Sequence, residues 1–133
     1  GAAPLVLGHD VENPETVATA IRIGKPASGS KALAARDESN GLISSVTDEQ
    51  ILDAQAFLAA KEGIFVEPAS AAGVAGLLAL KQSGDLPAGQ RIVITVTGNG
   101  LKDIDTALSR TELSTEAVEP STDRVAALLG LHR

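Results

Sequence analysis

The feature that most constrains the fold is the segment RIVITVTGNGLKD, residues 91–103. Residues 91–97 are β-branched and nearly continuously apolar, which is typical of a central parallel strand buried on both faces. Gly98 and Gly100 then form a turn, and residues 101–109 have the pattern of a short helix. Because parallel strands need crossover helices that cover the sheet, the segment predicts a layered α/β fold.

Helix signals and strand signals alternate along the rest of the chain. The letters TDEQ at 47–50 form a capping box, and the helix that it opens is expected to end at Gly63. Another helix, apolar on nearly every side, is expected to start at Pro68 and to end at Gly84. The expected core positions of the first of these helices are Ile51, Ala54 and Leu58. Further expectations are a strand end or loop at 4–8, helices at 14–24, 31–36 and 122–129, and strands at 41–46 and 64–66.

This alternation predicts a three-layer αβα fold with a mostly parallel sheet and right-handed crossovers. Only three or four strands can be recognised, which is few for a self-sufficient doubly wound domain. The sequence also contains no methionine, not even at position 1. We therefore expect residues 1–133 to form a single α/β unit that is a partial domain and belongs to a longer protein.

Composition excludes several classes of function. The formal net charge of −6 and the presence of only two aromatic residues argue against binding to nucleic acid. The absence of cysteine rules out disulfides, thiolate metal sites and cysteine nucleophiles. His9 and His132 lie near opposite ends of the chain, so we expect neither catalysis nor a metal site from them. No stretch is long and apolar enough to predict a membrane span.

Two polar side chains follow predicted strands at the edge where α/β proteins place ligands. Thr97 ends one strand, and Gly98 and Gly100 after it would let the backbone approach a ligand closely. Glu67 follows residues 64–66 and precedes a helix. Spacing alone leaves a plain alternative for each: Thr97 ends a strand before an ordinary turn, and Glu67 complements the helix dipole. Lys102 and the other lysines are expected to be solvated rather than covalent.

Taken together, several motifs resemble the threonine synthase family, within the tryptophan-synthase β-type (fold type II) enzymes that use pyridoxal 5'-phosphate (PLP). The similar stretches are PETVATAIRIGKPAS at 14–28, VTDEQIL at 46–52, EGIFVEPASAAGVAGLLAL at 62–80 and VITVTGNGLKDID at 93–105. The resemblance extends over about residues 1–107. It implies two α/β domains with the cofactor between them, and this chain would be the C-terminal part of the larger domain.

The resemblance also implies roles for individual residues. Thr97 matches the family's threonine that hydrogen-bonds the pyridine nitrogen of the cofactor. Ala20, Ile21 and Arg22 match the segment that passes one face of the cofactor ring. Glu67 and Gly98 would border the same cofactor-binding site. The implied reaction is a step of threonine biosynthesis that converts O-phosphohomoserine and water to L-threonine and phosphate. The resemblance also implies that the full-length enzyme is cytoplasmic and forms a homodimer.

The chain departs from the family pattern in two respects. It contains no motif like the one that carries the family's Schiff-base lysine, so we expect no catalytic residue in this chain and no activity from it alone. Gly29 stands where many relatives have a tryptophan. Two alternatives stay open: a stand-alone, non-catalytic α/β module that binds a ligand or regulates a partner, and a fragment of a related PLP-dependent threonine or serine dehydratase.

Overall fold

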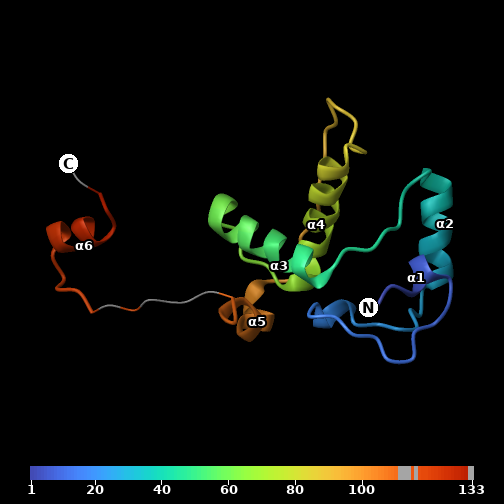
Figure 1. Ribbon diagram of the computed structural model, residues 1–133, viewed down its shortest axis with the longest axis horizontal. Helices are drawn as coiled ribbons and strands as arrows, with labels where there is room; N and C mark the ends of the chain where they lie inside the picture. Colours follow the sequence, from blue (N-terminus) through green and yellow to red (C-terminus); the bar gives the residue numbers. More distant parts are fainter. Residues whose placement is uncertain (111–114, 116, 132–133) are drawn as a thin grey trace.

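The computed structural model describes residues 1–110, 115 and 117–131, and these residues fold mainly into helices (Figure 1). The elements in chain order are α1 (Pro4–Leu7), η1 (Thr19–Ile21), α2 (Gly29–Ser39), α3 (Asp48–Phe57), η2 (Leu58–Glu62), α4 (Pro68–Ser83), η3 (Gly100–Asp103), α5 (Ile104–Leu108) and α6 (Thr122–Leu128). Of these, η1 and η3 are 3-10 helices and η2 is one turn of π-helix. Figure 1 shows α6 well apart from the other helices.

The core lies where α3 packs against the first half of α4 (Figure 1). The predicted apolar face is confirmed, because Ile51 and Ala54 of α3 and Leu58, the first residue of η2, are all buried. Helix α4 contributes mainly small residues, which allow its backbone to come close to α3. Outside α3 and η2, the buried hydrophobic core positions of the described residues are Ala18, Val66, Ala71, Val74 and Ala75. A helix that is apolar on nearly every side, as α4 is, is expected to be buried all round. This expectation is wrong for the second half of α4, where Leu78 is 37% exposed.

Local end signals place α3 and α4 as the sequence predicts. The Gln50 amide donates to Thr47 Oγ1 over 3.2 Å, and the Thr47 amide donates to Gln50 Oε1 over 2.8 Å, so the capping box is complete. Gly63 ends η2 with φ 67°, and Gly84 ends α4 with φ 82°. These left-handed conformations are the ones that glycine adopts without a steric penalty.

The N-terminal region differs from the predictions. Residues 4–8 form helix α1 rather than a strand end or loop, with Pro4 at its first position and Gly8 in the left-handed conformation after it. The helix predicted at 14–24 is reduced to the short η1. Asp48 explains the loss, since its carboxylate accepts the Thr16 hydroxyl over 2.5 Å and the Val17 amide over 3.1 Å. An amide engaged in this way is not available to a helix.

The parallel sheet stays a prediction, because the described residues contain no strand ladder. They contain one isolated antiparallel bridge, between Val66 and Asn99. Residues 41–46 and 91–97, expected as strands, have neither helical nor sheet hydrogen bonds. A strand exists only with a paired neighbour, and in the described structure Val93 of this segment is 89% exposed.

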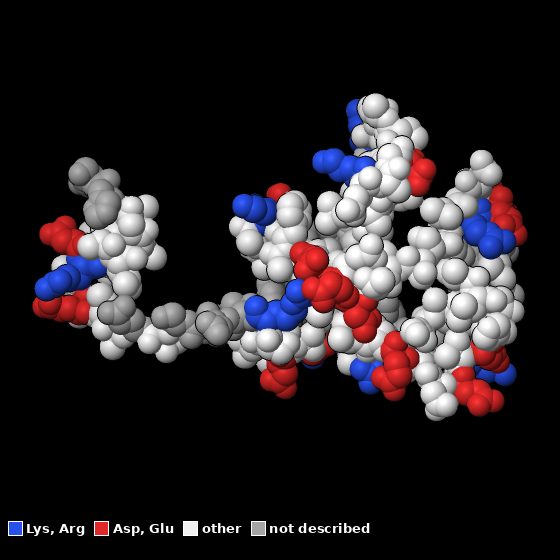
Figure 2. Space-filling view, viewed as in Figure 1, with Lys and Arg blue, Asp and Glu red and all other residues white. Residues whose placement is uncertain are grey.

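Surface features of the described residues are ordinary for a water-exposed chain. On the face drawn in Figure 2, Lys and Arg side chains lie among Asp and Glu side chains rather than forming a continuous basic area. No helix in the described part of the chain has the length and apolarity needed to cross a bilayer.

The capping box gives a test of the fold. Replacing Thr47 by alanine removes the side-chain acceptor at the start of α3, so the free energy of unfolding should fall by about 1 kcal/mol. Ser121, at the start of α6, makes no capping hydrogen bond and provides the matched control. Urea unfolding should show a lower midpoint for T47A and an unchanged midpoint for S121A. Equal midpoints for the two variants would contradict the role given to the cap.

Candidate functional site

The candidate site is built around Ser70, in the first turns of α4. Its side chain is buried, and its Oγ lies 2.6 Å from the amide nitrogen of Gly98 and 3.2 Å from that of Thr97. The same Oγ lies 3.2 Å from Thr97 Oγ1. One serine side chain thus fixes both the backbone and the side chain of the residues after the predicted strand. Thr97 itself is exposed, so its hydroxyl can meet a ligand.

Glu67 contacts the same turn at Gly98. Its amide donates to the Gly98 carbonyl over 3.0 Å, and its side chain is 9% exposed. A Cβ added to Gly98 would overlap the Glu67 carboxyl group, so any other residue at this position would have to displace that carboxyl group. Lys102 Nζ lies 3.8 Å from Glu67 Oε1 but is 65% exposed, which agrees with its expected solvation.

The second glycine of the turn is explained in the same way. A Cβ on Gly100 would come within about 2.6 Å of the Phe65 ring. Neither glycine has positive φ, so both are present for close contact and not for an unusual backbone conformation. Asn99 between them accepts the Leu101 amide at its Oδ1 over 2.9 Å and starts η3. The glycines, read from sequence as space for a ligand, make room for this protein's own side chains.

The described structure leaves a carboxylate oxygen of the same motif without a hydrogen bond. Asp103 Oδ1 accepts the Thr106 hydroxyl over 2.7 Å, whereas its Oδ2 is buried and has no partner among the described residues. Buried carboxylate oxygens are normally hydrogen-bonded. Asp103 was not predicted as a site residue, and it lies on the helical turn that follows Gly100.

Ala20, Ile21 and Arg22 lie at η1, which packs against α4. All three are exposed. The Arg22 guanidinium donates to the Thr16 carbonyl from Nε over 3.0 Å and from Nη2 over 2.6 Å. The structure therefore brings these residues to the helix that carries Ser70, but among the described residues no hydrogen bond joins them to Thr97.

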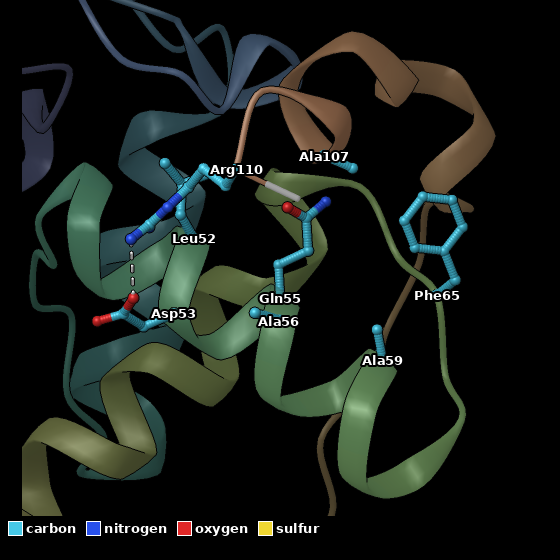
Figure 3. A pocket seen from close by; sticks show the side chains of 8 residues that line it. All are labelled: Leu52, Asp53, Gln55, Ala56, Ala59, Phe65, Ala107 and Arg110. Carbon is cyan, nitrogen blue, oxygen red and sulfur yellow. Dashed lines mark ion pairs between the residues drawn. The ribbon is translucent and has the colours of Figure 1, made fainter. Parts of the chain in front are cut away.

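Two hollows lie on the described surface. One, of 220 Å³, lies between α3 and the chain at and after the end of α5, and Arg110 in it reaches Asp53 over 3.3 Å (Figure 3). Arg110 also reaches Glu49 over 2.6 Å. The other is a groove of 1180 Å³ between the N-terminal segment, residues 42–48 and one side of α4. Neither hollow is lined by Thr97 or Glu67, whereas Ile21, a predicted cofactor-site residue, lines the groove.

Sequence reasoning missed Ser70 and Gln55. The Gln55 side chain is buried and donates to the Val66 carbonyl over 2.8 Å, which holds the segment before Glu67 against α3. The sequence contained a signal for both, because each is a polar residue that lies among the apolar positions of a predicted helix. Such a residue is buried only when it has a hydrogen-bond partner.

Comparison with known proteins agrees with the motifs. Residues 1–98 match the family model described as pyridoxal-phosphate dependent enzyme. The chain is 51% identical to a threonine synthase of Synechocystis sp. over 98% of its length, and 57% identical to that of Mycobacterium leprae over 81%. A threonine synthase of a Bacillus strain is 47% identical over 94% of the chain. These matches cover 34%, 30% and 36% of the three relatives, so the chain spans about a third of their length.

The resemblance predicted from the four motifs is thus confirmed, and it implies the α/β fold of these enzymes although the described residues show no sheet. With its family model extending over residues 1–98, the chain belongs to the pyridoxal-phosphate dependent enzyme family.

Proposed function

We propose that the chain is part of a threonine synthase, which converts O-phosphohomoserine and water to L-threonine and phosphate. The observation that carries the proposal is the 51% identity to a threonine synthase over 98% of the chain. The geometry adds the hydroxyl of Thr97, an exposed residue at the end of the predicted strand, which lies 3.2 Å from the hydroxyl of the buried Ser70. When bound, PLP supplies the electron sink for such a reaction.

Thr97 fits the pyridine nitrogen of PLP in chemistry and in setting. A threonine hydroxyl is neutral, so it does not hold that nitrogen protonated as a carboxylate would. The Ser70 contact fixes where the hydroxyl lies, and the Gly98 backbone is fixed by Ser70 and Glu67 together. In this proposal Glu67 and Gly98 support the wall of the cofactor site.

Ala20, Ile21 and Arg22 form the second part of the proposed cofactor site, at one face of the ring. Their exposure leaves them free to contact a ligand. Asp48 supports this placement, because it holds Thr16, whose carbonyl in turn holds the Arg22 guanidinium. The segment is thereby tied to the start of α3 rather than left to adopt a helix.

We propose that residues 1–133 are the C-terminal part of the large domain of a two-domain, homodimeric enzyme of the cytoplasm. The Schiff-base lysine would then come from another part of the protein. The environments of two lysines support this, because Lys25 is 85% exposed beside Asp10 and Lys102 is 65% exposed beside Glu67. A covalent lysine needs a desolvated site, which neither has.

The reaction is tested by assaying the complete protein that contains this chain. We expect release of phosphate from O-phosphohomoserine with formation of threonine, and no comparable formation of 2-oxobutanoate from threonine. Replacing Thr97 by valine keeps the side-chain shape and removes the hydroxyl, so kcat/KM should fall by about 10- to 100-fold. T97S keeps a hydroxyl and should stay close to wild type. A protein that deaminates threonine and ignores O-phosphohomoserine would be a dehydratase.

The placement of the lysine has its own test on the 133-residue chain. After incubation with PLP and reduction with borohydride, mass spectrometry of the digested chain should show no single lysine carrying the reduced cofactor in stoichiometric amount. Low, scattered labelling of exposed lysines is the expected background. A single, fully labelled lysine among Lys25, Lys31, Lys61, Lys81 and Lys102 would contradict the proposal.

A further inference from the structure

The hydrogen bonds of Ser70 determine where its proton goes. Its Oγ receives the Gly98 amide over 2.6 Å and the Thr97 amide over 3.2 Å. A hydroxyl has two lone pairs and one proton. Backbone N–H groups can only donate, so these two contacts occupy both lone pairs of the Ser70 oxygen. Any further hydrogen bond of this hydroxyl must be one in which it donates.

Thr97 Oγ1, 3.2 Å away, is the remaining hydrogen-bond partner of the Ser70 hydroxyl among the described residues. The contact could run in either direction when it is viewed alone. With both lone pairs of Ser70 occupied, Ser70 must be the donor and Thr97 the acceptor. The Thr97 proton is consequently not used by Ser70 and can be given to a ligand at the exposed side of the residue.

We propose that Ser70 is a positioning residue that makes Thr97 a hydrogen-bond donor toward the cofactor. The inference rests on the proposed function, in which Thr97 faces the pyridine nitrogen of PLP. Accepting the Ser70 proton strengthens Thr97 as a donor, because hydrogen bonds in a chain polarise one another. A donor at this place favours an aromatic nitrogen that offers its lone pair. Ser70 thus selects the unprotonated form of the ring through Thr97, without touching the cofactor.

The test compares PLP with its 1-deaza analogue, in which the ring nitrogen is replaced by a C–H group that cannot accept a hydrogen bond. The dissociation constants of both compounds are measured for the complete protein as wild type, S70A, T97V and the S70A/T97V double variant. The measured quantity is the preference for PLP, the ratio of the two constants. Losses that come only from a weakened fold lower both affinities and leave this ratio unchanged.

We expect a preference of about tenfold in the wild type, about threefold in S70A and close to one in T97V. The double variant should equal T97V, because Ser70 acts only through Thr97 and the two effects are therefore not additive. S83A is the matched control: Ser83 is a serine of the same helix whose hydroxyl donates to the Leu80 carbonyl over 3.1 Å. Its preference should be that of the wild type.

A wild-type preference in S70A would overturn the role of Ser70 while leaving the proposed function intact. A wild-type preference in T97V would instead contradict the placement of Thr97 at the ring nitrogen, and the inference would fail with it. S70A leaves the buried Gly98 amide without its acceptor and can fail to fold. S70C is the second variant, because its sulfur fills the site but is a weak donor and acceptor, and it should show the same reduced preference as S70A.

Discussion

The buried hydroxyl of Ser70 is the contact on which the candidate site depends. It joins α4 to residues 27 and 28 positions further along the chain, Thr97 and Gly98. Gly98 is buried, and among the described residues its amide has no hydrogen-bond acceptor in a sheet. The Ser70 hydroxyl is the acceptor that this buried amide needs. The position of the Thr97 side chain follows from this contact, because its own amide and hydroxyl both meet the same oxygen.

Close packing around the turn makes the arrangement specific. The Glu67 carboxyl group occupies the space where a side chain at 98 would lie, and the Phe65 ring occupies the space at 100. Gln55 holds the segment that carries both of these residues, through the Val66 carbonyl. Helix α3 therefore supports the turn although it does not touch Thr97 by any hydrogen bond of the described structure. A substitution at either glycine would have to displace the Glu67 or the Phe65 side chain.

The sequence predicted those parts of the fold whose signals are local. The capping box at Thr47 and the terminal glycines at 63 and 84 act within a few residues, and the structure has all of them. The predicted helix at 14–24 was wrong because Asp48, far along the chain, takes hydrogen bonds from Thr16 and Val17. The sheet could not be tested in the same way, since β-branched residues such as those at 91–97 form a strand only beside a partner strand.

The candidate site shows the same division between local and distant causes. Sequence could select Thr97, because a hydroxyl after a buried-strand pattern lies at a ligand-binding edge in α/β proteins. It could not give the direction of the hydroxyl proton, which depends on how many donors surround Ser70 in space. In this arrangement Ser70 of α4 determines that the Thr97 hydroxyl donates a hydrogen bond to a ligand instead of accepting one. A change in which ligands bind at Thr97 would therefore require substitutions in α4 as well as in the turn after residue 97.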